Sequence, residues 1–269
     1  MKNLKKLSLF LGLIGCFNAL VAQSTDAFEK KVFINGIDTI GYRILLPENY
    51  KPNKKYPFIL VLHGIGERGS DNELQLIHGS KLFLADSNRK KFPAIVVFPQ
   101  CPGNSFWSNV RFRQPTPENA DRFEFVVDES PTAAMRALNT LFHHLLKTYK
   151  VNRQQIYIGG LSMGGMGTFE MVYRNPGVFA AAFPICGGAN VQTAASMKDV
   201  NWWIFHGAKD DVVPSVLSQN MYEALLNNKQ TVRFSLYPEA NHNSWDNAFS
   251  EPNLLSWLFS VKNKAAQSK

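Results

Sequence analysis

A serine framed by glycines stands near the middle of the chain. Ser162 lies in the string Gly-Leu-Ser-Met-Gly at 160–164, directly after the apolar run 155–159 and before a helical stretch. A strand-to-helix turn of this kind is sharp enough to need glycines two before and two after the serine, and it exposes the hydroxyl at a sheet edge. Such strings also occur by chance, so it is the strand before and the helix after that predict a nucleophile.

A serine hydroxyl is a poor nucleophile until a base takes its proton, and an acid must hold that base in the right tautomer. After a turn of this kind, an acid and then a histidine follow the serine along the chain. His242 fits this order, because it lies just after the apolar run 232–237. The acid is Asp210 or Asp211, which follow the run 202–205. Both positions lie at the carboxyl ends of predicted strands, where such sheets bind their ligands.

The other histidines fit the role of base less well. His206 also ends a strand, but it precedes both aspartates, so the chain order excludes it. His143 and His144 lie within a predicted helix. We expect the aspartate that is not the acid to cap or brace the helix that begins near Pro214.

Acyl transfer passes through a negative oxygen, which needs backbone donors that are already in place. One donor is the amide after the nucleophile, here Met163. The second comes from the loop after an earlier strand, and the string Leu-His-Gly-Ile-Gly-Glu-Arg-Gly at 62–69 has the glycines to turn its backbone inward. We choose Ile65 as this donor. His63 is expected to brace the loop, and Glu67 and Arg68 to stiffen it by pairing.

Short apolar runs and helical stretches alternate along the chain, as in a parallel sheet covered by helices on both faces. The runs are 58–62, 94–98, 155–159, 180–185, 202–205 and 232–237, and the helices are 132–149, with Ser130 as its N-cap, 164–174, 214–227 and 252–261. A hairpin of 31–34 and 37–46 around Asn35-Gly36 precedes them. The sequence predicts an α/β protein: a doubly wound, mostly parallel sheet with an antiparallel N-terminal hairpin and no large lid, in one catalytic domain over 23–269.

Five strings together resemble a known family. They are Leu-His-Gly-Ile-Gly-Glu-Arg-Gly at 62–69, Pro-Gln-Cys-Pro at 99–102, Gly-Leu-Ser-Met-Gly-Gly at 160–165, His-Gly-Ala-Lys-Asp-Asp-Val-Val-Pro at 206–214 and His-Asn-Ser-Trp at 242–245. They are similar to the phospholipase/carboxylesterase-like branch of the α/β-hydrolase fold, and more closely to secreted esterases labelled predicted peptidases, which are related to feruloyl and acetylxylan esterases. The similarity covers roughly residues 30–260.

The resemblance implies a secreted serine esterase that needs no cofactor and acts on an acylated carbohydrate or a similar extracellular ester. It assigns the role of acid to Asp210, the first aspartate of its string, and it supports Ile65 as an oxyanion donor. Dienelactone hydrolases, a neighbouring branch, carry cysteine where this chain has Ser162.

Three residues are candidates for substrate binding. Trp107, in the long segment 101–129, and Trp245, beside His242, could stack on a sugar or an aryl group, and each could equally pack under a loop. Gln100 is a weaker candidate beside the oxyanion loop. The segment between 180 and 202 is too short for a helical lid, so we expect an open site that a polymeric ester could reach.

The N-terminus has the layout of an export signal. Lys2, Lys5 and Lys6 precede an apolar run, and residues 19–22 are Ala-Leu-Val-Ala, which predicts cleavage after residue 22. In the alternative, Leu-Ile-Gly-Cys at 13–16 is a lipobox and Cys16 carries a lipid anchor in the cell envelope. Loss of the three lysines would take the formal charge from +8 to +5. The other basic residues are scattered, which argues against a nucleic-acid partner.

Apart from Cys16, only Cys101 and Cys186 are present. Two cysteines cannot form a paired-cysteine metal site, and we expect no metal. They follow predicted strands that have two other strands between them at about 4.8 Å a step, so we expect free thiols.

Three other functions remain open from the sequence. A serine peptidase would need an extended cleft or gating domain, and an acyltransferase differs only in the group that attacks the acyl-enzyme. A non-catalytic carbohydrate-binding protein could keep the same fold, although the serine, aspartate and histidine argue against it.

Overall fold

The computed structural model describes residues 25–114, 122–127 and 129–263. The predicted leader 1–22, with Cys16, lies outside this range. An eight-stranded sheet has the order β1-β2-β4-β3-β7-β8-β9-β10. Its strands are β1 (Glu29–Asn35), β2 (Asp38–Leu45), β3 (Tyr56–Leu62), β4 (Ile95–Pro99), β7 (Val151–Leu161), β8 (Ala181–Ile185), β9 (Asn201–Gly207) and β10 (Thr231–Tyr237). β2 is antiparallel to β1 and to β4, and every other neighbouring pair is parallel.

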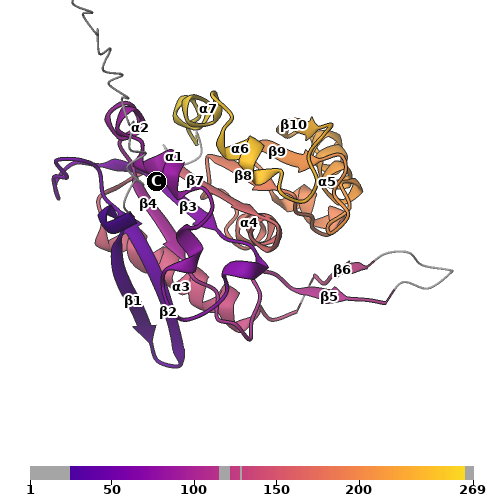
Figure 1. Cartoon of the computed structure of the whole chain (residues 1–269), viewed down its shortest axis with the longest axis horizontal. Coiled ribbons are helices and arrows are strands. Elements are labelled where there is room, and N and C mark those ends of the chain that lie inside the picture. Colours follow the sequence, from indigo (N-terminus) through magenta and orange to yellow (C-terminus); the bar gives the residue numbers. More distant parts are fainter. Residues whose placement is uncertain (1–24, 115–121, 128, 264–269) are drawn as a thin grey trace, which may run out of the picture.

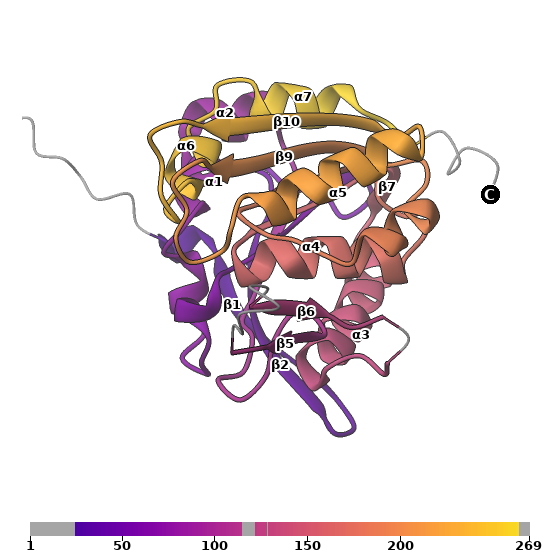
Figure 2. The same cartoon turned by 90° about the vertical axis from the view of Figure 1, so that its right-hand side faces the viewer.

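Helices cover both faces of this sheet (Figures 1 and 2). One face packs against α3 (Ala133–Thr148), α4 (Met163–Arg174) and α5 (Val216–Asn227), and this layer holds Phe142, Phe169 and Met221. The other face packs against α1 (Ser80–Leu84), α2 (Asp86–Lys91), α6 (Trp245–Phe249) and α7 (Leu254–Ser260), with Phe83 and Leu258 buried there. The central strands of the sheet are therefore buried on both sides, which confirms the predicted doubly wound α/β fold.

The helix boundaries follow local signals. α3 begins at Ala133 because Thr132 is its N-cap: the Thr132 side chain accepts a hydrogen bond from the Met135 N–H. The prediction of Ser130 as the cap is therefore wrong by two residues. α4 ends before Asn175-Pro176, since proline cannot continue a helix.

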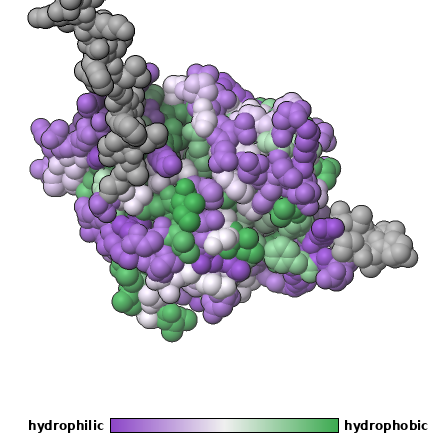
Figure 3. Space-filling view, in the orientation of Figure 1, coloured by the Kyte–Doolittle hydropathy of each residue, from purple (hydrophilic) through white to green (hydrophobic). Residues whose placement is uncertain are grey.

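The N-terminal hairpin forms as predicted. Asn35 pairs with Asp38, and Gly36 takes a φ of 61°, which glycine adopts without strain. Val32, Ile34 and Ile37 are exposed on this hairpin, and Figure 3 shows a hydrophobic area low in the view where it ends. This edge of the sheet lies at the opposite end of the strand order from β9 and β10.

The long segment after β4 carries structure that the sequence did not predict. β5 (Val110–Phe112) and β6 (Phe123–Phe125) pair antiparallel in a separate two-stranded ribbon that projects from the body (Figure 1). Between β8 and β9 the chain forms only the short helix η4 (Val191–Ser196). Among the described residues no helix is both long and apolar enough to cross a membrane.

Candidate active site

Ser162 lies at the turn between β7 and α4 in a backbone conformation that few residues adopt. Its φ is 52° and its ψ is −116°. A methyl group on Gly160 would lie 2.6 Å from the carbonyl oxygen of Leu62, and one on Gly164 would lie 2.1 Å from the same atom. Both glycines are therefore required by the close approach of β3, as the sequence predicted.

The structure brings the three predicted catalytic side chains together. Ser162 Oγ lies 3.0 Å from His242 Nε2, and His242 Nδ1 lies 2.9 Å from Asp210 Oδ2 and 3.1 Å from Asp210 Oδ1. Because an ionised carboxylate only accepts hydrogen bonds, Nδ1 carries the proton and Nε2 is free to accept from the serine hydroxyl. This is the tautomer that a general base needs.

Backbone contacts hold the aspartate and histidine loops against each other. Asn241 Oδ1 accepts hydrogen bonds from the backbone N–H groups of His242 and Asp211, and Lys209 N–H donates to Ala240 O. A methyl group on Gly207 would lie 2.3 Å from Asn241 O, so only glycine lets the loops pack this closely. The distance between Asp210 and His242 is thus fixed by two loops that are bonded directly to one another.

Asp210 is buried and surrounded by donors. Its side chain is 0% exposed, and it accepts from the N–H groups of Val212 and Val213 as well as from two histidines. Burial alone would raise its pKa, but the bonds from His206, His242 and Val213 N–H hold the pKa of this carboxyl well below its usual range. Asp210 therefore stays ionised beside His242 at neutral pH.

Asp211 takes neither of the roles open to it. It is exposed, and the N-terminus of α5 has no side-chain cap. The second aspartate was expected to cap or brace this helix, and it does not cap it, because α5 begins five residues further on, at Val216, with Ser215 in the N-cap position.

One predicted oxyanion donor follows Ser162 in the chain, and the other belongs to a loop that lies beside Ser162. Met163 is the first residue of α4, and within the described residues its N–H and that of Ile65 donate to no protein acceptor. The Ile65 loop lies against the nucleophile, since a methyl group on Gly64 would lie 3.7 Å from Ser162 Cβ. Two free N–H groups beside the hydroxyl are what a developing oxyanion requires.

Buried hydrogen bonds brace the oxyanion loop. His63 Nδ1 donates to Gly64 O at 2.6 Å, and Nε2 accepts from the Cys101 N–H at 2.9 Å. Burial lowers the pKa of His63 to about 4, so it is neutral in the folded protein. The expected bracing role of His63 is confirmed.

Gln100 braces the same loop and is not available to a substrate. It is 2% exposed, donates to Glu67 O and to Asp71, and accepts from Asn72 N–H. The expectation that Gln100 belongs to the substrate pocket is therefore wrong. The expected Glu67–Arg68 pair is also replaced, because Arg68 donates to the carbonyl oxygens of Ile65 and Ser105.

The two tryptophans lie in different surroundings. Trp107 is 0% exposed and packs edge-on against His63 and against Gly167, so the expectation that it stacks on a substrate is wrong. The Trp107 side chain therefore packs the segment after β4 against the body of the protein. Trp245 is half-buried and presents its ring edge-on to His242, at 5.3 Å between centroids. Trp245 remains a prediction for substrate binding.

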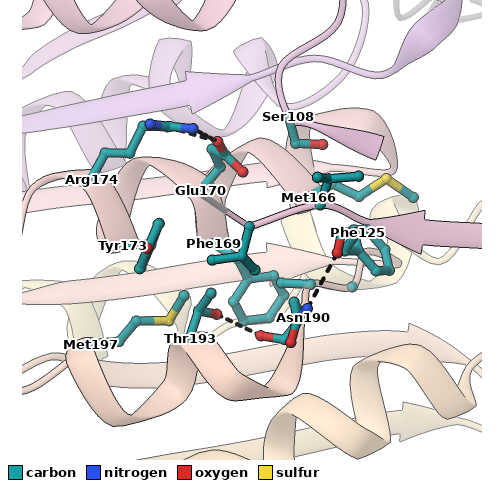
Figure 4. A pocket seen from close by; sticks show the side chains of 14 residues that line it. Ser108, Phe125, Met166, Phe169, Glu170, Tyr173, Arg174, Asn190, Thr193 and Met197 are labelled. Carbon is teal, nitrogen blue, oxygen red and sulfur yellow. Dashed lines mark hydrogen bonds and ion pairs between the residues drawn. The ribbon is translucent and has the colours of Figure 1, made fainter. Parts of the chain in front are cut away.

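A cavity that is partly open to solvent runs along α4 between β6 and η4 (Figure 4). Met166, Phe169 and Tyr173 line it from the helix, and Phe125 lines it from the ribbon. Among the α4 residues that line the cavity, Met166 is the one nearest to Ser162 along the chain, and it lies one helical turn beyond that serine. Ser162 itself does not line the cavity. We assign this cavity no part in the chemistry of the triad.

One group among the described residues has the side-chain chemistry to hold a metal ion. Ligand atoms of Cys186, Asp210 and His242 all lie within 4.8 Å of one another. Asp210 and His242 are already bonded to each other, and burial raises the pKa of the Cys186 thiol, which disfavours the thiolate that binds metals. We therefore assign the group to the triad.

The family model of the phospholipases/carboxylesterases matches residues 49–252, which include Ser162, Asp210 and His242. The chain belongs to this family.

Known proteins extend the comparison. The chain is 27% identical, over 172 residues and 63% of its length, to a bifunctional acetylxylan esterase/xylanase from Neocallimastix patriciarum, of which it spans 21%. It is 32% identical to a thermostable esterase of known structure with a TM-score of 0.77, covering 88% of this chain and 64% of that one. A ferulic acid esterase from Anaeromyces mucronatus, solved with ferulic acid, shares the fold at 17% identity, with a TM-score of 0.60 over 85% of this chain and 89% of that one.

Sequence reasoning missed one residue of this carboxylesterase-like site. His206 was excluded as the base by chain order, and the structure agrees that it is not the base, yet its Nε2 lies 3.1 Å from Asp210 Oδ2. The signal that could have identified His206 is its position four residues before Asp210, with Gly207 between them. A turn at that glycine can bring the two side chains together.

Proposed function

We propose that the chain hydrolyses carboxylic esters through an acyl-enzyme on Ser162. The observation that carries the proposal is the continuous relay from Ser162 Oγ through His242 to Asp210, at 3.0 and 2.9 Å, beside two free backbone donors. Family membership and the similarity to named esterases support the same reaction class.

The geometry supports a two-step mechanism. Ser162 Oγ attacks the ester carbon while His242 Nε2 takes its proton, and the N–H groups of Ile65 and Met163 bind the carbonyl oxygen as it becomes negative. The intermediate collapses, and the leaving alcohol departs with the proton from His242. A water molecule then gives its proton to His242 and attacks the acyl-enzyme, which releases the carboxylic acid and restores Ser162.

We propose an acylated carbohydrate or a similar extracellular ester as the substrate. The similarity to an acetylxylan esterase/xylanase supports this class, and the short connection between β8 and β9 leaves the site without a lid in the described chain. Trp245 at the rim could stack on a sugar or aryl group.

We also propose that the protein is exported. The basic and apolar pattern of residues 1–22 supports cleavage after residue 22, and the lipobox at 13–16 supports the alternative of an anchor on Cys16. The mass of the N-terminal peptide from the native host distinguishes the two. An intact leader on the protein outside the cytoplasm contradicts both.

A substrate panel tests the proposed reaction. Wild type and Ser162→Ala are assayed on chromogenic acetate, butyrate and ferulate esters and on a p-nitroanilide. We expect ester turnover in the wild type and a fall of about 10⁴-fold or more in the variant, whose thermal unfolding should be unchanged. Turnover confined to the anilide would support a peptidase, and acyl transfer to added sugar in place of release would support a transferase.

A fluorophosphonate probe separates an enzyme from a binding protein. It should label wild type and leave Ser162→Ala unlabelled, because only an activated serine reacts. An unlabelled wild-type chain that still binds carbohydrate would refute the catalytic proposal.

A further inference from the structure

A second imidazole, that of His206, contacts the Asp210 carboxylate beside His242. His206 lies in β9 and is 0% exposed. Its Nε2 lies 3.1 Å from Asp210 Oδ2 and 2.9 Å from Val213 O. Both partners are acceptors, so Nε2 carries a proton and donates to them.

The other side of the His206 ring is held as firmly. Nδ1 lies 2.7 Å from Ser218 Oγ, and Ser218 Oγ lies 2.7 Å from the carbonyl oxygen of Gly187. The hydroxyl has one proton for these two neighbours. If the hydroxyl donates its hydrogen bond to Gly187 O, then Nδ1 must donate to Ser218 Oγ, and His206 carries a proton on both nitrogens as an imidazolium. If the hydroxyl donates to Nδ1, His206 is neutral.

We propose that His206 is a positioning residue that fixes the Asp210 carboxylate and weakens its attraction for the proton on His242. In either protonation state the ring donates to Asp210 Oδ2, the same oxygen that lies 2.9 Å from His242 Nδ1. The same carboxylate oxygen thus accepts hydrogen bonds from two imidazole rings, so its interaction with each ring is weaker. This inference rests on the proposed function, because it assigns a role in the same relay.

Few titratable or charged groups face this carboxylate, which also accepts from the N–H groups of Val212 and Val213. Those that face it are His206 from β9, His242 from the loop before α6, and the Cys186 thiol from the end of β8. Lys209 is exposed and paired with Glu239, and Asp211 is exposed. The donor from His206 is therefore the interaction to vary.

Two amide variants make a matched pair. In His206→Gln the amide reaches about as far as Nε2 and keeps the donor to Asp210, whereas in His206→Asn it reaches about as far as Nδ1 and loses this donor while keeping Ser218 as partner. Without the donor, Asp210 stabilises protonated His242 more strongly. We expect the acidic limb of kcat/KM for His206→Asn to move up by about half a pH unit or more. His206→Gln should keep the wild-type limb.

A merely structural role would lower activity without moving this limb, and an unshifted limb in folded His206→Asn overturns the proposal. If His206→Asn does not fold, the ¹⁵N spectrum of the wild-type protein still tests the proposal, which requires a proton on His206 Nε2. A folded wild-type protein in which Nε2 carries no proton overturns it.

Imidazole NMR titration of ¹⁵N-labelled protein provides a readout that needs no substrate. His242 should lose its proton at higher pH in His206→Asn than in wild type. Failure of the proposed function would appear as absent wild-type turnover, whereas failure of this inference would appear as superimposed His242 titrations.

Discussion

Contacts with neighbouring residues hold Ser162, the proposed nucleophile, in a strained backbone conformation. A positive φ for a residue other than glycine costs about 1–3 kcal/mol. The Ser162 N–H donates to Ile185 O at 2.8 Å, and the two flanking glycines pack against β3. The strain is thus held by contacts made by other strands, and it aims Oγ at His242.

The two adjacent aspartates allow a direct test of the acid. Asp210→Asn should lower kcat by about 10⁴-fold, because an amide no longer holds His242 in the tautomer with a proton on Nδ1. Asp211→Asn is the matched control and should stay within a few-fold of wild type, since Asp211 is exposed. Steady-state kinetics on one ester measures both, and a larger loss in Asp211→Asn would reverse the assignment.

At the scale of elements, the loop after β3 should make stability depend on pH. Burial lowers the pKa of His63 to about 4, whereas an unfolded histidine has a pKa of about 6.5. Below pH 6.5 His63 is therefore protonated in the unfolded chain but stays neutral in the folded chain. The free energy of unfolding falls as the pH falls towards 4. Between pH 7 and 5 we expect a loss of about 2 kcal/mol from this group.

Urea unfolding of wild type and His63→Gln at the two pH values measures this loss. The variant can still accept the Cys101 N–H bond but cannot be protonated, so its free energy of unfolding should change less with pH by that amount. Equal changes in the two proteins would show that His63 does not control the effect. Asp210, whose pKa is lowered, loses its contribution only as the pH falls below about 3.8, outside this interval.

The elements that the sequence predicted well are those with strong local signals. The strand predicted at 232–237 is β10, Thr231–Tyr237, in the structure. The helix predicted at 214–227 is α5, Val216–Asn227. The ribbon of β5 and β6 was missed because its strands are three residues long and only partly buried, which leaves little periodicity to detect.

The site was predictable where a motif fixes a side chain and not where packing does. Ser162 and His242 follow from chain order and strand ends, whereas the choice of Asp210 over Asp211 also needed the family resemblance. For Trp107 the sequence left open whether it stacks on a substrate or packs under a loop, because its burial depends on contacts with His63 and Gly167 that no local pattern encodes. The bond from His206 to Asp210 likewise depends on how a loop turns back over a strand.

At the scale of the whole molecule, one continuous sheet joins both halves of the site. Cys101 follows β4 and Cys186 follows β8, with β3 and β7 between these strands. Both cysteines are free, as predicted, and both are buried. Burial raises the pKa of Cys101 to about 12 and that of Cys186 as well, which suppresses the reactive thiolate.

These thiols should report whether the sheet unfolds as a unit. A sheet with one core on each face is expected to open cooperatively, so both thiols should become reactive at the same urea concentration. Pulses of iodoacetamide across a urea series, followed by peptide mass spectrometry, measure each cysteine separately, and far-UV circular dichroism gives the global transition. Earlier labelling of Cys186 would mean that the β8–β10 half, with Asp210 and His242, opens before the rest, and the triad would then be lost before the fold.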